Sequence, residues 1–209
     1  MAGLKIRIGI FGGTFDPPHL GHLILAAEAK DQLKLDRLLW VLTPDPPHKK
    51  KQRLTPIEIR YNLVEASLKN DDNFELSRVD LDRPGPHYTL DTIKIIAERF
   101  PEADIFYIIG GDSLSDFPNW YRAKDILTAV SGLGVMRRPG DEIDLDCLES
   151  NLPGIKEKVR FVDAPLLEIS SHEIRKRILE SSPYRYYLKP EVFDLIRNEN
   201  LYSGVSEHN

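Results

Sequence analysis

Residues 6–22 read IRIGIFGGTFDPPHLGH, an apolar run followed at once by a turn rich in glycine and proline and then by two histidines. The apolar run has the composition of a buried strand, and the histidines stand where a helix would begin. Backbone N–H groups at a helix start have no partner within the helix and carry partial positive charge, so anions bind there. Gly12 and Gly13 would let the main chain come close to such an anion. We therefore expect a phosphate-binding junction between a strand and a helix.

His19 and His22 are three residues apart, which on a helix places both imidazoles on one face. We predict that they donate hydrogen bonds to phosphates and that Thr14 adds its hydroxyl. Two alternatives remain open. The histidines could be a pair of metal ligands, although zinc wants three or four protein ligands and no Cys or acidic partner stands at a suitable spacing. They could also simply cap an ordinary turn.

Length and composition indicate one folded domain. The chain has 209 residues, of which 41% are hydrophobic and 29% charged, and its net charge is -5. These values are ordinary for a globular protein, and the negative charge disfavours nucleic acid as a partner. Cys147 is the single cysteine, which excludes an internal disulfide and suits a reducing cytosol. No apolar run has the length of a signal peptide core or a membrane span, so we expect a cytoplasmic protein with no membrane partner.

Apolar runs alternate with amphipathic stretches along the chain. The pattern predicts strands at 5–11, 38–42, 74–79, 105–109, 132–136 and 159–162, and helices at 20–34, 56–69, 89–99 and 113–129. Short strands separated by helices pair in parallel, and runs without polar alternation are covered on both faces. We therefore expect a single-domain α/β fold, a doubly wound Rossmann-like parallel sheet with flanking helices, on which a helical subregion at 180–209 packs.

Polar residues follow several of these strands, and ligands of such sheets bind at the carboxyl ends of the strands. The candidates lie after the strands at 5–11, 38–42, 105–109 and 132–136, in the segments 12–22, 44–51, 110–112 and 137–140. In the second segment Lys49 would meet phosphates as a mobile point charge. A solvated surface loop is the alternative there.

Three further segments suggest ligand contacts. Thr89 is predicted to cap a helix whose free N–H groups would suit a carboxylate, or else it is merely a helix cap. Asp112 could accept bonds from ribose hydroxyls and Trp120 offers a flat face for an aromatic ring, unless they are a helix cap and a core side chain. Residues 169–175 read ISSHEIR, in which Ser170 and Glu173 are expected to form a capping box at the start of another helix. Arg175 would then either contact an anion bound at this helix start or lie on the surface.

Residues 12–22 and 169–175 resemble the two signatures of the HxGH nucleotidyltransferases. Neither the P-loop pattern nor the dinucleotide fingerprint is present. The segments at Tyr88-Thr89, Trp120-Tyr121 and Arg138 are similar to those of the nicotinate-nucleotide adenylyltransferase family. The resemblance implies an enzyme of NAD biosynthesis that transfers the adenylyl group of ATP, with Mg²⁺ on the triphosphate, to nicotinic acid mononucleotide. The products would be deamido-NAD and pyrophosphate.

The resemblance also implies roles for individual residues. The catalytic residues would be His19, His22, Lys49 and Arg175. ATP would contact Gly12, Gly13, Thr14, Phe15, His19, His22, Gly110, Asp112, Ser170, Ser171 and Arg175. The mononucleotide would contact Tyr88, Thr89, Asp112, Trp120, Tyr121 and Arg138. The protein itself would supply no metal ligand, and its partners would be these small molecules, with a homo-oligomer left open. His172 stands where the family usually has Ser or Thr, which puts one hydroxyl contact with phosphate in question.

Two other functions remain open. The acceptor could be phosphopantetheine, although that branch has typically shorter chains and lacks the Trp-Tyr pair. The chain could also be a non-catalytic nucleotide-sensing module built on the same cradle. Every nucleotide hypothesis requires the helix starts near Gly13 and Ser171 to face one another across a common cavity.

Overall fold

The sheet is parallel and has six strands. The structure, a computed structural model, describes residues 5–45, 54–137, 143–165 and 167–204. Its strands are β1 (Arg7–Gly13), β2 (Arg37–Leu42), β3 (Glu75–Ser77), β4 (Asp104–Gly110), β5 (Gly132–Arg137) and β6 (Val159–Asp163). They lie in the order β3-β2-β1-β4-β5-β6, and every neighbouring pair is parallel. The order changes direction between β1 and β4, which is where such sheets bind ligands.

Side chains of the central strands alternate between two hydrophobic clusters. In β1, Ile8 and Ile10 belong to the cluster on one face and Phe11 to the cluster on the other. In β2, Val41 and Trp40 divide in the same way. Both faces of the sheet are therefore buried, which confirms the predicted doubly wound α/β fold.

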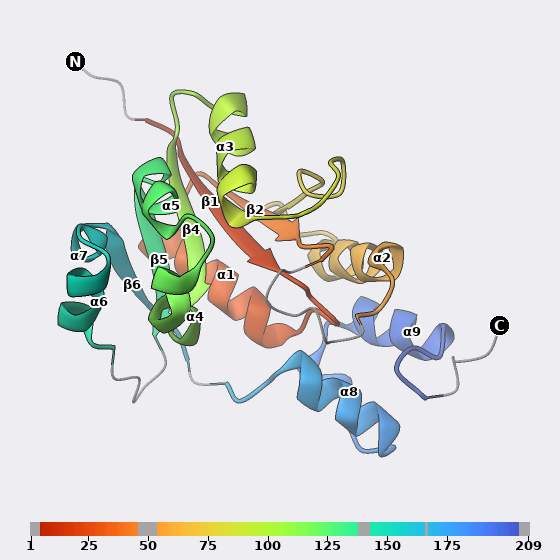
Figure 1. The fold of residues 1–209 in the computed structure, drawn as a ribbon. Coiled ribbons are helices and arrows are strands. Elements are labelled where there is room, and N and C mark those ends of the chain that lie inside the picture. The colour runs from red at the N-terminus through yellow and green to blue at the C-terminus, as the bar shows by residue number, and fades with distance from the viewer. Residues whose placement is uncertain (1–4, 46–53, 138–142, 166, 205–209) are drawn as a thin grey trace.

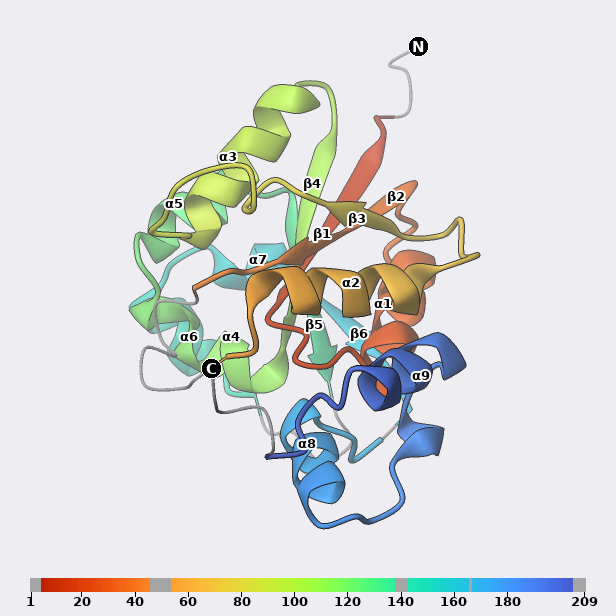
Figure 2. The ribbon, with the colours of Figure 1, turned by 90° about the vertical axis from the view of Figure 1, so that its right-hand side faces the viewer.

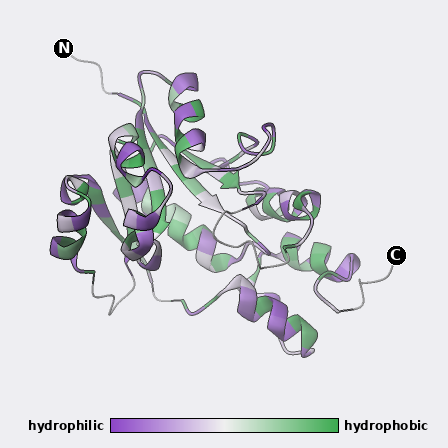
Figure 3. Ribbon diagram, in the orientation of Figure 1, coloured by the Kyte–Doolittle hydropathy of each residue, from purple (hydrophilic) through white to green (hydrophobic). Residues whose placement is uncertain are grey.

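Helices cover both faces (Figures 1 and 2). One face carries α3 (Thr89–Arg99), α4 (Gly111–Asp116), α5 (Ala123–Ala129), α6 (Leu145–Asn151) and α7 (Ile155–Lys158); the other carries α1 (Leu20–Gln32) and α2 (Ile57–Leu68). Figure 3 shows that the helices bear both hydrophilic and hydrophobic residues, as expected for helices packed on a sheet.

The helical region predicted at 113–129 is divided into three elements. The segment contains α4, the short 3-10 helix η2 (Phe117–Asn119) and α5. Pro118 has no N–H to donate in a continuous helix, and Arg122 adopts a left-handed conformation with φ of 58° at the N-cap of α5. The sequence pattern also gave no indication of α6 and α7, because both are short.

The C-terminal region packs on α2 and forms a third hydrophobic cluster. It contains α8 (Ser171–Leu179), the 3-10 helix η3 (Arg185–Tyr187) and α9 (Pro190–Asn198). Leu63 of α2, Ile174 and Ile196 meet in this cluster. Figures 1 and 2 place α8 and α9 beyond the end of β1, so this region borders the edge of the sheet at which β1 and β4 end. Among the helices of the described residues, none combines the length and apolar composition that crossing a bilayer requires.

Candidate active site

Two adjoining cavities open where the strand order changes direction. Their volumes are about 640 Å³ and about 490 Å³. Thr14, which follows β1, Gly110, which ends β4, and Met136 of β5 line both cavities. The site therefore has two compartments with a shared wall at the carboxyl edge of the sheet.

The first cavity brings the two predicted signatures together. Its lining includes most of the predicted ATP contacts, namely Thr14, His19, His22, Gly110, Asp112, Ser170, Ser171 and Arg175. Direct contacts join the two segments as well. The Ser171 hydroxyl donates to the carbonyl of Pro17 at 2.8 Å, and Nη1 of Arg175 donates to the carbonyl of Asp16 at 2.6 Å. The expectation that these helix starts face one another across one cavity is confirmed.

The two histidines stack at the start of α1. Their ring centroids are 3.7 Å apart, with 29° between the planes. The backbone N–H of His19, the N-cap residue, donates to Nδ1 of His22 at 3.2 Å. An acceptor nitrogen carries no proton, so the proton of a neutral His22 lies on Nε2. His22 thus helps to cap the helix, as one alternative held, and keeps Nε2–H as a donor suited to a phosphate oxygen.

His19 is held in the neutral state by its surroundings. Its side chain is buried, with 6% of the residue exposed, and burial lowers its pKa from 6.5 to about 4. Nδ1 of His19 is buried and has no hydrogen-bond partner among the described residues. A buried ring nitrogen without such a partner is costly to the folded protein.

The low pKa of His19 makes folding stability depend on pH. Between about pH 4 and 6.5 the unfolded chain binds a proton at His19 that the folded chain does not. The free energy of unfolding should therefore fall as the pH decreases through this interval, by on the order of 3 kcal/mol in total. Urea denaturation at pH 7 and pH 4.5 should show a clearly smaller loss for His19→Gln than for the wild type. The exposed His172 offers a control: His172→Gln should keep the wild-type loss, and an unchanged loss in His19→Gln would contradict the assignment.

The second signature begins α8 as the sequence predicts. Ser170 is the N-cap, and its hydroxyl oxygen accepts from the backbone N–H of Glu173 at 3.1 Å. His172, in the first turn, is exposed and lines the first cavity. The start of this helix therefore presents backbone amides, a hydroxyl, an imidazole and a guanidinium to the same space.

The second cavity collects the aromatic candidates. Tyr88, Thr89, Trp120 and Tyr121 all line it. Trp120 packs against Tyr107 and Phe117, with centroid distances of 6.2 and 5.2 Å, while remaining part of the cavity wall. The rings of Tyr88 and Tyr121 stack at 4.1 Å. A flat aromatic ligand would meet rings on this wall. Trp120 is thus packed as a core side chain and also offers a face to the cavity, so both alternatives for it hold in part.

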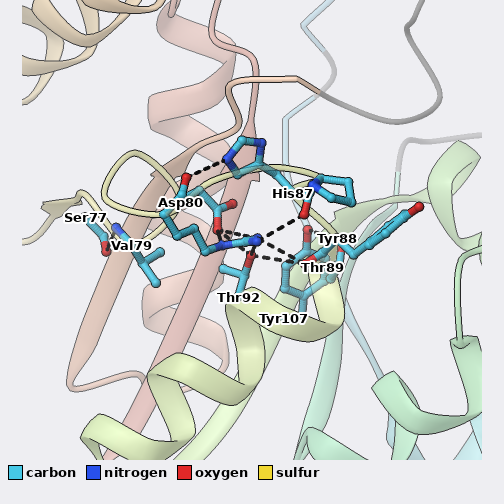
Figure 4. Close-up of polar contacts among 10 residues, drawn as sticks. Ser77, Val79, Asp80, His87, Tyr88, Thr89, Thr92 and Tyr107 are labelled. Carbon is cyan, nitrogen blue, oxygen red and sulfur yellow. Dashed lines mark hydrogen bonds and ion pairs between the residues drawn. The ribbon is translucent and has the colours of Figure 1, made fainter.

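A buried polar network fixes the segment before α3 (Figure 4). Oδ1 of Asp80, 3% exposed, accepts from the Thr92 hydroxyl at 2.7 Å and from Nε of Arg83 at 3.0 Å, and it forms an ion pair with that guanidinium. Nη1 of Arg83 also donates to the carbonyl of Pro86 at 3.1 Å. Figure 4 shows Tyr88 and Thr89 beside this network. The network therefore fixes the position of the first residues of α3 at the second cavity.

The predicted N-cap of α3 is wrong by one residue. Tyr88 is the N-cap, and Thr89 is the first helical residue. The Thr89 hydroxyl lies 3.4 Å from the hydroxyl of Tyr107 on β4, so it contacts the sheet rather than capping the helix. The helix start still lines the cavity, as the carboxylate hypothesis requires.

Some predicted contacts fall elsewhere. Gly12 and Gly13 belong to β1 and line the second cavity rather than the first. A Cβ atom at Gly12 would lie 2.9 Å from the Tyr107 hydroxyl, so close packing also demands glycine there. Phe15 is buried among Phe11 and Trp40 and lines neither cavity, so only its backbone could meet ATP.

Asp112 lines one cavity only, and two predicted basic residues are outside the part of the chain that the structure describes. Asp112, predicted to contact both substrates, lines the first cavity only. Lys49 and Arg138 lie outside the described residues. Within the described part of the chain, no group of three His, Cys, Asp or Glu side chains could hold a metal ion.

A buried arginine that the sequence pattern did not indicate lies beneath the site. Arg60 of α2 is 2% exposed, and its guanidinium donates to the carbonyls of Thr14, Thr43, Pro44 and Thr55 at 2.8 to 3.1 Å. Burial lowers its pKa, and the negative charge of Asp16 raises it in part. Arg60 therefore joins the loop after β1, the end of β2 and the start of α2.

The chain matches a known family over most of its length. Residues 10–177 match the cytidylyltransferase-like family. The chain belongs to this family. It is 38% identical over 199 residues to the "Probable nicotinate-nucleotide adenylyltransferase" of Thermomicrobium roseum, covering 95% of this chain and 92% of that one. It is 35% identical over 198 residues to the nicotinate-nucleotide adenylyltransferase of Bacillus subtilis, covering 95% and 99%.

Solved structures share the fold. The nicotinic acid mononucleotide adenylyltransferase of Plasmodium falciparum, complexed with NaAD, matches with a TM-score of 0.78 at 22% identity, over 95% of this chain and 98% of that one. A second structure of the same enzyme, complexed with APC, gives a TM-score of 0.76 at 22% identity, with the same coverage.

Proposed function

We propose that this protein transfers the adenylyl group of ATP to nicotinic acid mononucleotide. An oxygen of the mononucleotide 5′-phosphate attacks the α-phosphorus of ATP, and the bond from that phosphorus to the oxygen bridging to the β-phosphate breaks. Pyrophosphate leaves with the bonding electron pair, and deamido-NAD forms. The observation that carries the proposal is the pair of adjoining cavities with a shared wall, together with relatives of this activity that match nearly the full chain.

The first cavity is assigned to ATP. The starts of α1 and α8 both reach it, and together with Arg175 they offer donors to a triphosphate. Nε2–H of His22 would stabilise the charge that builds on the α-phosphate oxygens as attack proceeds. No side chain needs to act as a nucleophile, because both reacting groups are phosphates of the substrates. Catalysis then consists of alignment and charge stabilisation.

The second cavity is assigned to the mononucleotide. Trp120 and the stacked Tyr88 and Tyr121 suit a pyridine ring. The first backbone amides of α3 suit its carboxylate. Lys49 keeps its predicted role as a charge near the phosphates, and Arg138 its predicted contact with the mononucleotide.

Magnesium is assigned to the substrate. Relatives of this kind use ATP, and a divalent ion carried on the triphosphate would neutralise part of its charge. We place the reaction in the cytoplasm, with small molecules as partners. The homo-oligomer stays a prediction that gel filtration would test.

Pyrophosphate release tests the activity directly. Purified protein with ATP and Mg²⁺ should release pyrophosphate in the presence of nicotinic acid mononucleotide, and deamido-NAD should be the second product. Phosphopantetheine should give little release at equal concentration. Release with phosphopantetheine alone would transfer the assignment to that acceptor, and ATP binding without release on either acceptor would favour a nucleotide sensor.

Substitution of Arg83 should change the KM of one substrate only. Lysine cannot reach Asp80 and the Pro86 carbonyl together as the guanidinium does, so Arg83→Lys should loosen the segment before α3. We expect KM for the mononucleotide to rise about tenfold and KM for ATP to stay within about twofold. Steady-state pyrophosphate release measures both constants. The nearby Arg78, exposed and paired with Asp82, gives the control variant Arg78→Lys, which should change neither. An equal rise in both KM values for Arg83→Lys would contradict the prediction.

A further inference from the structure

One tyrosine of the C-terminal segment contacts the loop between β1 and α1. The Tyr202 hydroxyl donates to Oδ1 of Asp16 at 2.8 Å, across 186 positions of sequence. Oδ2 of the same carboxylate accepts from the backbone N–H of Thr55 at 3.1 Å. Asp16 is 2% exposed, so its carboxylate is held by protein groups rather than by solvent.

Asp16 lies between the first cavity and α8. It precedes the histidine pair in the loop from β1 to α1 and lines the cavity. Its backbone carbonyl accepts from Arg175, and the next carbonyl, of Pro17, accepts from Ser171. A shift of the loop at Asp16 would therefore displace it relative to the second signature. Displacements of about 1 Å near a reacting centre can reduce turnover up to a hundredfold.

We propose that Tyr202 is a positioning residue for the ATP cavity: by holding the Asp16 carboxylate it fixes the loop between β1 and α1 against the start of α8. The C-terminal segment is then part of the nucleotide site, although it lies outside residues 10–177, which match the family. This inference rests on the proposed binding of ATP in the first cavity.

Tyr202 is itself firmly placed. The preceding Leu201, 9% exposed, belongs to the hydrophobic cluster that contains Ile174 of α8 and Ile196 of α9. Figure 2 shows α8 and α9 together beyond the end of β1, with the chain after α9 returning past them. Burial and the charge of Asp16 raise the pKa of the Tyr202 hydroxyl, so it stays a proton donor throughout the pH range of an assay. The contact is therefore built from a packed segment and a permanent donor.

Binding of an inert ATP analogue tests the role without the acceptor. Tyr202→Phe keeps the ring and removes the hydroxyl. Calorimetric titration of the full chain with α,β-methylene-ATP and Mg²⁺ should show about tenfold weaker binding in this variant, since a hydrogen bond to a charged group is lost. Titration with nicotinic acid mononucleotide should change less than about twofold. Tyr184, whose ring packs against Phe193 in the same region, gives the matched control Tyr184→Phe, which should bind both ligands normally.

A double-mutant cycle separates positioning from general loss of structure. In an Asp16→Ala background, Tyr202→Phe should alter affinity for the analogue by less than about twofold, because the group through which it acts is gone. Full additivity of the two substitutions would overturn the inference, as would equal weakening of both ligands by Tyr202→Phe. If Asp16→Ala fails to fold, the comparison of the two affinities in the single variant decides. Absence of analogue binding in the wild type would overturn the proposed function as well, whereas normal binding in both wild type and Tyr202→Phe overturns the role of Tyr202 alone.

Discussion

His22→Ala should lower kcat by about 10²- to 10³-fold, the loss usually seen when one donor to a developing oxyanion is removed. The imidazole of His22 lines the first cavity and keeps its proton on Nε2, because Nδ1 accepts from the backbone of His19. Under the proposed role its contribution would be greatest when charge builds on the α-phosphate, so kcat should fall more than KM for ATP rises. Pyrophosphate release at saturating concentrations of both substrates measures the loss.

The capping contact of His22 calls for a second variant. His22→Ala removes the acceptor for the His19 N–H and should lower the free energy of unfolding by about 1 kcal/mol. Asparagine can still accept that bond with its side-chain oxygen. His22→Asn should therefore keep most of the stability and lose turnover to the same extent as His22→Ala. Turnover within about threefold of wild type in either variant would refute the phosphate role of His22.

Arg60→Met should lower the free energy of unfolding by on the order of 4 kcal/mol. The methionine fills much of the volume, but four carbonyl acceptors lose their donor and the charge of Asp16 loses its nearby cation. Such a loss is a large fraction of the 5 to 15 kcal/mol that stabilises a typical domain. Urea denaturation at pH 7 should show a much lower midpoint.

An exposed arginine provides the matched control for Arg60. Arg99 is exposed at the end of α3. The variant Arg99→Met should leave the urea midpoint almost unchanged. Arg60→Lys should fall between wild type and Arg60→Met, because three ammonium protons on one atom cannot reach carbonyls on three separate segments. An Arg60→Met midpoint equal to that of Arg99→Met would show that the buried guanidinium contributes nothing to stability.

The fold could be predicted because its central strands are continuous apolar runs. Runs such as 105–109 are apolar at every position because both faces of the sheet are covered. Burial of both faces can therefore be predicted from a few neighbouring residues. The end of β1 was missed because Gly12 and Gly13 look like a turn, although they pair with Val41 and Leu42. Pro118 indicates a break in the helix, but the amphipathic pattern on either side of it indicates a helical region.

The site could be predicted only where its residues stand close together in sequence. The histidine pair and the start of α8 are local signals, since capping and spacing act over a few residues. Arg60, Asp80 and Asp16 gave no such signal, because a charged residue in a helix or loop is usually solvated. Asp80 is 12 residues from Thr92, Arg60 is 46 from Thr14 and Asp16 is 186 from Tyr202, so only the folded chain brings these partners together.

The wall shared by the two cavities bears on the design of inhibitors. Thr14, Gly110 and Met136 separate compartments that would hold a nucleotide and a pyridine ring, so a compound with two heads could occupy both at once. Once one head is bound, the second meets its compartment at a high effective concentration, and the linked compound can bind 10²- to 10⁴-fold more tightly than either half. The tether would have to cross the partition beside Gly110, which ends β4 and where an added Cβ atom would meet no atom of the described residues within 4 Å.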